Sequence, residues 1–423
     1  MRRLGLFVVS TLYVLSQMAL GGASSSAFAQ GNSPDANGAI PDAYSALLPL
    51  INTPARNPNT AGAAATSVST AAAATDSNGS LGQGDPQDVD DPTASTGVWR
   101  SYSAIDPSTY ANNLVVSTNI GYSSDNGQTF SLALELNPGS DTSTSGSTWD
   151  NETPSLFSDL ADWTANSSWK VIWDHHVTAN GNVNLNAAWL GMRSTNVPNG
   201  TWSSEVKLLA GAPYDPNNSF SPGPTLYPLP SALGDCLYLT EPGTLTATNG
   251  FYMSLVCYSI GSNRSVVPRV ALLQFTYPVG ATKATLSVKG TLLNSSSDVS
   301  RFVSLYGKQY PELQTTSGFT EPSLVTTFGK TYLLASPITQ NAQFGKHDAG
   351  CAVFQVTNLS NAAILRTPNG APQMIKYVQG PANTPRGACT YTPHDTGSGI
   401  NFAEISPGSS PPIQIVESLV QLP

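Results

Sequence analysis

The sequence predicts an all-β chain folded as a β-propeller, and three observations support this prediction. Short runs rich in β-branched and aromatic residues alternate with Gly, Asn, Pro and Ser throughout residues 98–423. No segment of that region keeps a helical apolar period of 3.6 residues for several turns. The region is also too long for a single β-sandwich, which usually has about 100 residues, whereas a ring of small sheets fits its length.

A repeated hairpin motif supports the ring. The stretch from Gly318 to Ser336 combines a Glu-Pro pair at Glu321, a short apolar run, a Gly-containing turn and a second β-rich run. The same order of acid, Pro, small residue, Leu, turn and aromatic strand begins at Glu241 and at Glu152. Internal repeats of this kind indicate a repeat architecture. We therefore expect hairpins at all three places, each forming the inner part of a blade.

Residues 1–29 have the features of a secretory signal peptide. Arg2-Arg3 is followed by a mostly apolar run from Leu4 to Leu20, and Ala27-Phe28-Ala29 fits a small-x-small cleavage site. We expect a secreted or periplasmic protein. The alternative is an uncleaved N-terminal anchor, which the shortness of the apolar run disfavours. No later stretch approaches the roughly 20 apolar residues of a membrane span, so none is expected.

Residues 30–96 are rich in Ala, Ser, Thr, Gly, Asn and Pro. Such a composition buries too little apolar surface to offset its ordering entropy, so we expect a disordered spacer. Ala43 to Ile51 is the exception, because it fits a short helical turn docked on the main domain. Residues 97–423 are then the propeller domain.

Five blades fit the domain best. Their first strands are expected at Trp99 and near Glu152, Glu241, Glu321 and Arg386. The fifth blade has only three strands before the chain ends, so we expect a strand from near the start of the domain to complete it. Six blades are the alternative, because the second and third blades have room for insertions.

Composition narrows the class of partner. The net charge is −9 and charged residues make up 11% of the chain, which argues against a nucleic-acid partner, since that would need a basic surface. Few charges and many Asn, Ser and Thr favour a surface of neutral hydrogen bonds. Exported proteins that handle carbohydrate have this character.

The even number of cysteines predicts disulfides in an exported chain. Four cysteines allow three pairings. The blade layout favours Cys236 with Cys257, inside the third blade, and Cys351 with Cys389, between the fourth and fifth. A metal site at these cysteines is disfavoured because no Cys-x-x-Cys spacing occurs.

One turn resembles the Asp-box of sialidases and other β-propellers. Read from Ser123, the sequence to Phe130 places Asp125, Gly127 and Thr129 at the positions of that motif. Its Asp accepts turn N–H bonds and its Gly supplies a positive φ. The motif supports a propeller and indicates no activity.

Glu321-Pro322-Ser323-Leu324, followed by Gly329-Lys330-Thr331-Tyr332, resembles the inner hairpin of five-bladed glycoside hydrolases of families 43, 32 and 68. The resemblance implies an exported enzyme that hydrolyses a poly- or oligosaccharide and needs no cofactor. It implies a base or nucleophile from the first blade, a supporting acid from the second and a general acid from the third. Glu152 then matches the supporting acid and Glu241 the general acid.

The first blade departs from this pattern. Asp106-Pro107-Ser108 looks like the motif, but it follows Trp99–Ile105, which is expected to be the innermost strand. A hairpin turn is the simpler interpretation of Asp106. In that case Glu321 would have to serve as base or nucleophile.

Propeller geometry gathers the candidate site. Innermost strands begin at one face of the central channel, so five side chains are expected in one pocket: Arg100, Glu152, Glu241, Glu321 and Arg386. Carboxylates that share a pocket repel one another, so at least one pKa should rise. Glycoside hydrolysis needs this division between one protonated acid and one ionised partner.

Structural alternatives stand beside these roles. The glutamates can instead cap N–H groups of a neighbouring strand. Arg100 and Arg386 can pair with carboxylates for stability, or bind an anionic sugar. Trp149 is the best candidate for stacking on a sugar ring.

The sequence also bears on a metal site and on two alternative functions. His175-His176 and His347-Asp348 are expected to be hydrogen-bonded loop residues, so no metal site is predicted. A non-catalytic glycan-binding propeller and a sialidase-like exo-glycosidase are the alternative functions. The second needs three arginines and a Tyr nucleophile, and only Arg100 and Arg386 can be placed.

Overall fold

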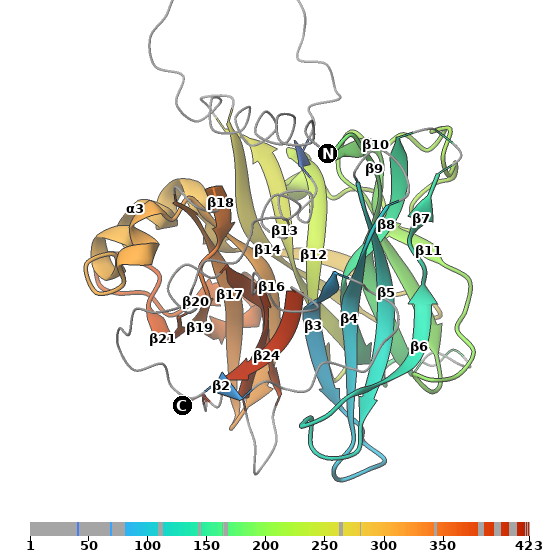
Figure 1. Cartoon of the computed structure of the whole chain (residues 1–423), viewed down its shortest axis with the longest axis horizontal. Helices are drawn as coiled ribbons and strands as arrows, with labels where there is room; N and C mark the ends of the chain where they lie inside the picture. Colours follow the sequence, from blue (N-terminus) through green and yellow to red (C-terminus); the bar gives the residue numbers. More distant parts are fainter. Residues whose placement is uncertain are drawn as a thin grey trace, which may run out of the picture.

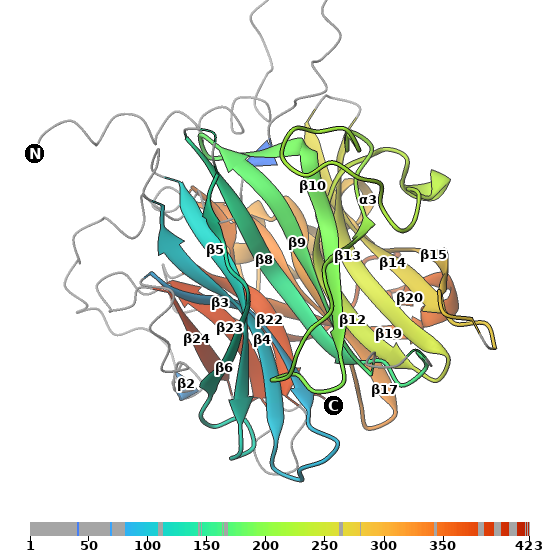
Figure 2. The ribbon, with the colours of Figure 1, turned by 90° about the vertical axis from the view of Figure 1, so that its right-hand side faces the viewer.

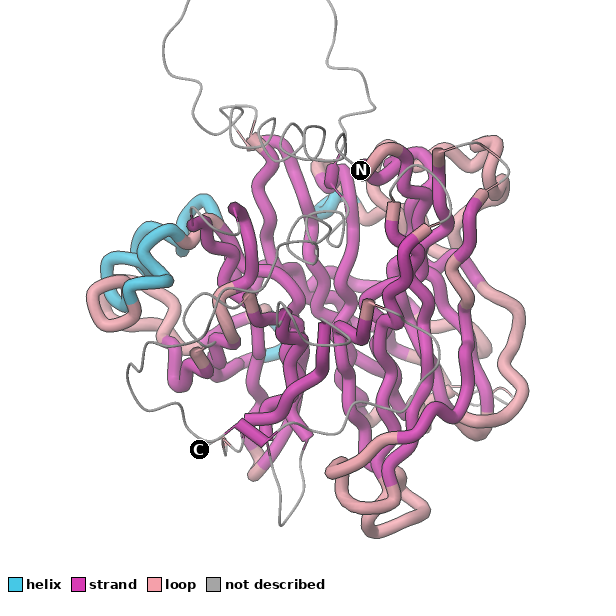
Figure 3. The backbone as a smooth tube through the Cα atoms, viewed as in Figure 1, coloured by secondary structure: helices cyan, strands magenta, loops and turns pink. Residues whose placement is uncertain are grey.

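The computed structural model describes residues 40–41, 68–69 and 81–423, apart from gaps at 109–112, 143, 145, 163, 165–167, 262–264, 280, 342–344, 380–384, 393–398, 406–412, 419, 421 and 423. Within these residues most of the backbone is strand, with helix gathered mainly at one edge (Figure 3). The expected signal peptide and the expected helical turn at 43–51 lie outside the described residues.

The described strands form four sheets, and the eight-stranded one is described here as two groups of antiparallel neighbours, the first and the fifth, which are joined by one parallel contact. The first holds β3 (Gly82–Asp90), β4 (Val98–Pro107), β5 (Leu114–Ser123) and β6 (Ser131–Asn137). The second holds β8 (Ser147–Ser158), β9 (Trp169–Ala179), β10 (Asn182–Thr195) and β11 (Val206–Leu209), with β7 (Ser140–Asp141) and β1 (Ile40–Pro41) at its edges. The third holds β12 (Cys236–Ala247), β13 (Gly250–Ile260), β14 (Val266–Thr276) and β15 (Thr285–Asn294).

The last two groups are less regular. The fourth holds β16 (Gly318–Thr327), β17 (Lys330–Asn341), β19 (Cys351–Asn358) and β21 (Met374–Val378), with β18 (Gly345–Asp348) beside β17 and β20 (Ala363–Ile364) beside β19. The fifth holds β22 (Arg386–Thr392), β23 (Gly399–Ile405), β24 (Ile413–Ser418) and β2 (Val68–Ser69). Short 3-10 turns are η1 (Ser231–Leu233), η2 (Pro311–Thr315) and η3 (Leu359–Asn361).

The five groups form a ring. Their first long strands, β3, β8, β12, β16 and β22, contact one another in a closed cycle in that order. In Figure 1, β3, β12 and β16 lie in the middle of the molecule, and Figure 2 shows β8, β9 and β10 side by side within one blade. Successive sheets around a common axis define a β-propeller, so the predicted fold class is confirmed.

Apolar side chains fill the spaces between neighbouring blades. Phe157 and Ile172 of the second blade pack in one buried cluster with Phe251 and Leu255 of the third. Each fully buried side chain of this kind contributes about 1.5–3 kcal/mol through removal from water. Packing between blades therefore holds the ring and fixes the positions of the innermost strands.

A short strand from the N-terminal side adds to the fifth blade. In β2, Val68 pairs with Ser418 and Ser69 pairs with Glu417, antiparallel to β24. A parallel contact of Ile413 with Gly82 also joins the fifth blade to the first. The expected closure of the fifth blade by an early strand is confirmed, although that strand lies within the range expected to be spacer.

The first blade begins earlier than expected. The boundary at residue 97 is too late, because β3 (Gly82–Asp90) is the innermost strand of this blade and most of it is buried. Trp99–Ile105 belongs to β4, the second strand, and not to the innermost one. A polar sequence forms a strand here because β4 pairs with it and the neighbouring blades cover it.

Both predicted disulfides are confirmed. Cys236 and Cys257 link β12 to β13 inside the third blade, with their Cα atoms 5.3 Å apart. Cys351 and Cys389 link β19 to β22, and therefore tie the fourth blade to the fifth, with a Cα separation of 6.0 Å.

One helix was not expected. α3 (Ser295–Tyr306) connects the third and fourth blades and lies at the edge of the ring in Figure 1. Asn294 caps its start by accepting a hydrogen bond from Ser296 N. Phe302 is buried against Phe319 and Phe354 of the fourth blade. No helix in the described part of the chain has the length and apolarity to cross a membrane.

The turn between β5 and β6 is held by side-chain hydrogen bonds. Ser123 Oγ accepts from Gly127 N at 2.9 Å, and Asp125 Oδ1 accepts from Thr129 N at 2.9 Å. Gly127 has a φ of +78°, which glycine adopts without a Cβ penalty. Phe130 is buried beneath the guanidinium of Arg100, 3.7 Å from its ring centre. These bonds make the turn a local structural device of the first blade.

Candidate functional site: carboxylates around the propeller axis

Each innermost strand carries a β-bulge at the same place. In the first blade Gly84 pairs with Ser103 and Gln87 pairs with Ser101, so three steps along β3 match two along β4. One extra residue in one strand constitutes a bulge. The other four innermost strands show the same shift, at residues 152–155, 240–243, 320–323 and 387–390.

The first residue of every bulge has a left-handed backbone conformation. Positive φ is uncommon for a residue other than glycine and costs about 1–3 kcal/mol, so the surroundings must hold it. The five residues and angles are Asp85 at 49°, Thr153 at 50°, Glu241 at 55°, Glu321 at 51° and Ala388 at 51°.

This shared conformation aligns the five strands residue by residue. Asp85 of the first blade is equivalent to Glu241 of the third and Glu321 of the fourth. Proline follows the first bulge residue in four strands, whereas Cys389, which is in a disulfide, follows it in the fifth. Three of the five equivalent positions therefore carry a carboxylate.

These residues line a small cavity on the axis, with a volume of about 30 Å³. That is about the volume one water molecule occupies in the liquid. Its walls come from all five innermost strands, through Asp85, Pro86, Gln87, Thr153, Pro154, Glu241, Pro242, Glu321, Pro322, Ser323, Ala388 and Cys389.

Two of the carboxylates cap the bulge of the next blade. Glu241 Oε2 accepts a hydrogen bond from Glu321 N at 2.6 Å and another from the Thr320 hydroxyl. Glu321 Oε2 accepts from Ala388 N. The structural alternative for Glu241 and Glu321, capping of N–H groups on a neighbouring strand, is thus observed for both.

The first blade achieves the same connection through a serine. Ser103 Oγ donates to Asp85 Oδ2 at 2.6 Å and accepts from Thr153 N at 3.0 Å. Asp85 therefore reaches the second blade's bulge amide indirectly. A buried backbone amide needs a partner of this kind, so the carboxylates and the strained bulges stabilise one another.

A fourth carboxylate completes the group. Asp348 is the last residue of β18. A Cβ atom added to Gly387 of β22 would lie 2.6 Å from the Cβ atom of Asp348, so the two strands are in close contact. Its carboxyl group is hydrogen-bonded to that of Glu321. We call Asp85, Glu241, Glu321 and Asp348 the axial cluster.

Three carboxyl groups of the axial cluster have raised pKa values. Burial raises the pKa of Glu241 to about 8, although hydrogen bonds from Thr320 and the Glu321 amide oppose this rise. Burial likewise raises the pKa of Asp348 to about 7 and the pKa of Glu321 well above its usual range. Neighbouring carboxylate charges add to the rise in all three. Adjacent carboxylates that share a buried site hold protons as a group.

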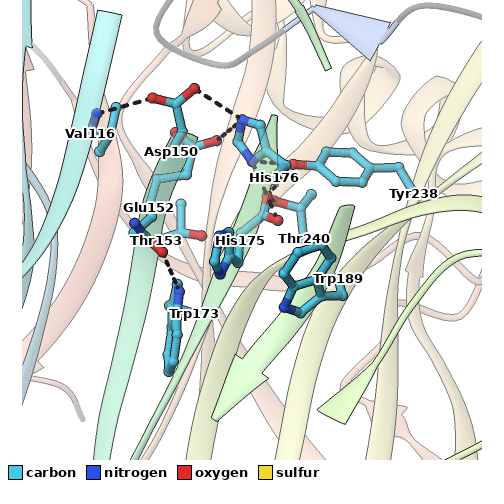
Figure 4. Close-up of polar contacts among 12 residues, drawn as sticks. Val116, Asp150, Glu152, Thr153, Trp173, His175, His176, Trp189, Tyr238 and Thr240 are labelled. Atoms are coloured by element: carbon cyan, nitrogen blue, oxygen red, sulfur yellow. Dashed lines mark hydrogen bonds and ion pairs between the residues drawn. The ribbon is translucent and has the colours of Figure 1, made fainter. Parts of the chain in front are cut away.

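Glu152 belongs to a second group of polar residues. It lies one residue before the bulge and does not line the axial cavity. The register of β8 with β9 places it directly opposite Asp174 and places Asp150 opposite His176. All four side chains are buried. We call Asp150, Glu152, Asp174 and His176 the histidine cluster (Figure 4).

Both nitrogens of the His176 ring face oxygen atoms. Nε2 lies 3.8 Å from Glu152 Oε1 and 3.9 Å from Asp150 Oδ2. Nδ1 lies 3.6 Å from Asp174 Oδ1 and 3.2 Å from the Tyr238 hydroxyl of β12. The histidine cluster therefore lies between the second and third blades.

The two predicted arginines do not line the cavity. Arg100 is on β4 and donates to both oxygens of Asp88, at 2.6 and 2.8 Å. Arg386 is on the innermost strand β22, but its guanidinium pairs with Glu404 of β23 and lies over Phe402. The structural alternative, ion pairing within the blades, describes both.

Two other candidates lie away from the axis. Asp106 is at the end of β4, where it pairs with Val115 of β5. Trp149 contacts His175 and Trp189 in an aromatic group. Because His175 and His176 are neighbours on one strand, they point to opposite faces of the sheet. Trp149 is therefore on the face opposite to the histidine cluster.

The sequence contained a signal for Asp85 that the composition obscured. Asp85-Pro86 precedes the aromatic strand at Trp99 as Glu241-Pro242 precedes Phe251 and as Glu321-Pro322 precedes Tyr332. The acid-proline pair lies within the range predicted to be a spacer. His176, Asp174 and Asp348 carried no comparable motif, because only strand register and loop placement bring them to their partners.

Comparisons with known proteins give a likeness of shape. No protein-family model and no curated protein sequence matches the chain. Among solved structures, an α-L-arabinofuranosidase from Podospora anserina in complex with cellotriose has 11% identity and a TM-score of 0.44, over 82% of this chain and 94% of that one. The catalytic domain of a family 62 α-L-arabinofuranosidase from Coprinopsis cinerea has 11% identity and a TM-score of 0.45, over 82% and 95%.

A putative glycosidase from Bacteroides thetaiotaomicron has 10% identity and a TM-score of 0.43, over 80% of this chain and 86% of that one. All three solved structures are described as glycosidases, the class that the sequence motifs resemble. Such low identities and TM-scores assign neither an activity nor a residue's role to this chain.

Proposed function

We propose that this protein is an exported glycoside hydrolase that cleaves a poly- or oligosaccharide at the axial cavity, with Glu241 as the proton donor. The observation that carries the proposal is the pairing of Glu241, whose pKa burial raises to about 8, with other carboxylates around one cavity. Perturbed carboxyl groups of this kind cluster at functional sites. Two disulfides fit an exported protein.

The proton donor must be protonated at the working pH. A carboxylic acid with a pKa near 8 keeps its proton at neutral pH, as a general acid for the leaving oxygen requires. Asp85 is the proposed ionised partner, because it holds the equivalent position in the first blade and accepts a hydrogen bond from Ser103. Asp85 would then serve as the base or nucleophile, the role that the sequence suggests for Asp106 or Glu321.

The size of the cavity limits what it admits. A volume of about 30 Å³ is far below the roughly 300–1,000 Å³ of ordinary ligand pockets. The sugar is therefore proposed to bind outside the cavity, with only the attacking water inside.

A glycan-binding propeller without catalysis is a second candidate function, and the hydrogen bonds of the axial carboxylates favour it. Glu241 and Glu321 already accept amide hydrogen bonds from the next blade, so their carboxylates serve the fold whether or not turnover occurs. A glycan-binding propeller without catalysis would need them only for this purpose.

The deciding experiment measures release of reducing ends from a panel of plant and microbial polysaccharides. Wild type is compared with Glu241→Gln and Asp85→Asn, and with Glu135→Gln, an exposed carboxylate of β6, as the matched control. Loss of a general acid typically costs about 10²–10⁴-fold in rate, so release should fall by that factor in Glu241→Gln while the control keeps it. Absence of release by folded wild type would support the binding propeller instead. Full activity in Glu241→Gln would exclude it as the proton donor.

A further inference from the structure

The histidine cluster has a donor set that the proposed hydrolysis does not use. The register of β8 with β9 places Glu152 and Asp174 directly opposite one another, with exposed fractions of 2% and 0%. Like charges opposite each other on a ladder destabilise a sheet, and buried charges need a compensating partner. Two carboxylates in this arrangement call for a cation between them.

We propose that Glu152, Asp174 and His176 bind one divalent transition-metal ion of the zinc class. One donor atom from each of these residues lies within 4.8 Å of the others. Imidazole nitrogen with carboxylate oxygen is a donor set that zinc accepts, at about 2.0–2.2 Å from each donor. Tyr238 and Thr240 of β12 close the other side by donating to Asp174 Oδ2.

The distances suit a site that contracts around an ion. One ion binds one imidazole nitrogen, and one such nitrogen with one oxygen each from Glu152 and Asp174 forms a set of donor atoms that lie within 4.8 Å of one another. Donors on one tetrahedral ion at zinc distances are about 3.3–3.5 Å apart, so small side-chain rotations bring them to bonding distance. Calcium prefers six to eight oxygen ligands, and the imidazole in this set therefore favours zinc over calcium.

A second observation points into the same space. Asp174 is fully buried, and its Oδ1 accepts no hydrogen bond from any residue in the described ranges, whereas Oδ2 accepts two. Oδ1 is the atom that faces the His176 ring. A buried carboxylate oxygen aimed at an imidazole is suited to bind an ion there.

The ring is oriented from both sides. If Nε2 binds the ion, Nδ1 faces the Tyr238 hydroxyl, and if Nδ1 binds it, Nε2 faces Asp150 Oδ2. Metal-binding histidines usually have such an outer partner, which fixes the tautomer. The three proposed ligands belong to the second blade, and Tyr238 and Thr240 of the third blade hydrogen-bond to Asp174, so a bound ion would stabilise this contact independently of any hydrolysis at the axis.

The test uses the full chain, freed of metal with a chelator and then titrated with zinc. Wild type is expected to bind a single ion per chain, and its melting temperature is expected to rise with zinc. Asp174→Asn and Glu152→Gln, which keep side-chain volume, should weaken zinc binding by more than the roughly 10–100-fold lost with an outer partner. His176→Ala should do the same.

The matched control is His175→Ala, the adjacent histidine on the opposite face of β9, which should keep wild-type affinity. Circular dichroism checks folding, and cobalt substitution gives a visible spectrum that reports the ion's coordination directly. The proposal is overturned if metal-free wild type takes up no stoichiometric zinc, or if folded Asp174→Asn and Glu152→Gln bind it as tightly as wild type. Loss of binding in His175→Ala alone would also overturn it.

Discussion

The axial cluster and the histidine cluster lie at or beside the innermost strands and differ in what surrounds their carboxyl groups. In the axial cluster, Glu241 and Glu321 accept hydrogen bonds from backbone amides, and Glu321 bonds to the carboxyl of Asp348. In the histidine cluster, carboxylates face both nitrogens of an imidazole. Burial and neighbouring carboxylates favour the protonated form in the first setting, whereas the second is the setting in which we propose a bound cation. The two settings lie one residue apart along β8, because Glu152 belongs to the histidine cluster and the next residue, Thr153, is the first residue of the bulge.

The largest effect is expected from Asp174→Ala. The change leaves the buried hydroxyls of Tyr238 and Thr240 without their acceptor, and each unsatisfied buried group of this kind costs about 1–3 kcal/mol. Glu241→Gln, which mimics the protonated acid, should cost less than about 1 kcal/mol at pH 6, since the neutral amide retains an acceptor. Urea unfolding of both variants at pH 6 measures the difference. Equal losses would erase the distinction between the two clusters.

The next effect is the pH dependence of stability. The pKa of Glu241 is raised from 4.5 to about 8 on folding, so the folded state binds more protons than the unfolded chain between these values. The contribution of this group to the free energy of unfolding is therefore complete below about pH 4.5 and is lost as pH rises through about 8. Asp348, raised from 3.8 to about 7, acts in the same direction.

Thermal unfolding should accordingly give a lower melting temperature at pH 8.5 than at pH 6. The slope should be shallower in Glu241→Gln, where one of the titrating groups is absent. A melting temperature that rises across this interval in wild type, with the same slope in the variant, would show that the axial cluster is ionised throughout.

The smallest effect is expected from Thr320→Val. This change removes one hydrogen bond to Glu241 while keeping volume, and a bond of this kind is worth about 1 kcal/mol. Because the hydroxyl favours the ionised form of Glu241, its loss should raise the pKa of that group further. Unfolding curves at several pH values should then show stability persisting to higher pH than in wild type. A shift to lower pH would contradict the assigned direction of the bond.

The sequence predicted the features that depend on local chemistry. The hairpins at Glu152, Glu241 and Glu321 follow from β-rich runs around turns, and all three are present. The two disulfide pairings followed from the blade layout and are correct. These features survive because each depends on a short stretch or on the order of blades along the chain.

The features that were missed depend on register and on neighbours. Gly82–Asp90 has few β-forming residues, yet pairing with β4 and cover from adjacent blades make it a strand. Because the sequence does not predict this strand, it points to Arg100 instead of Asp85 as the residue at the axis. Asp150 and Glu152 alternate as on a solvent-facing strand face, but that face meets β12 of the next blade. No periodicity in a single strand reveals which partner will cover it.

The pairing of β2 with β24 has a consequence for how the newly synthesised chain folds. Val68 and Ser69 are synthesised long before Glu417 and Ser418, their strand partners. Until the last strand arrives, the fifth blade is incomplete and its edges are available for pairing with other chains. Contacts so distant in sequence form slowly, so newly made molecules pass through an open ring. The time at which β24 forms its pairs therefore determines how long this aggregation-prone interval lasts.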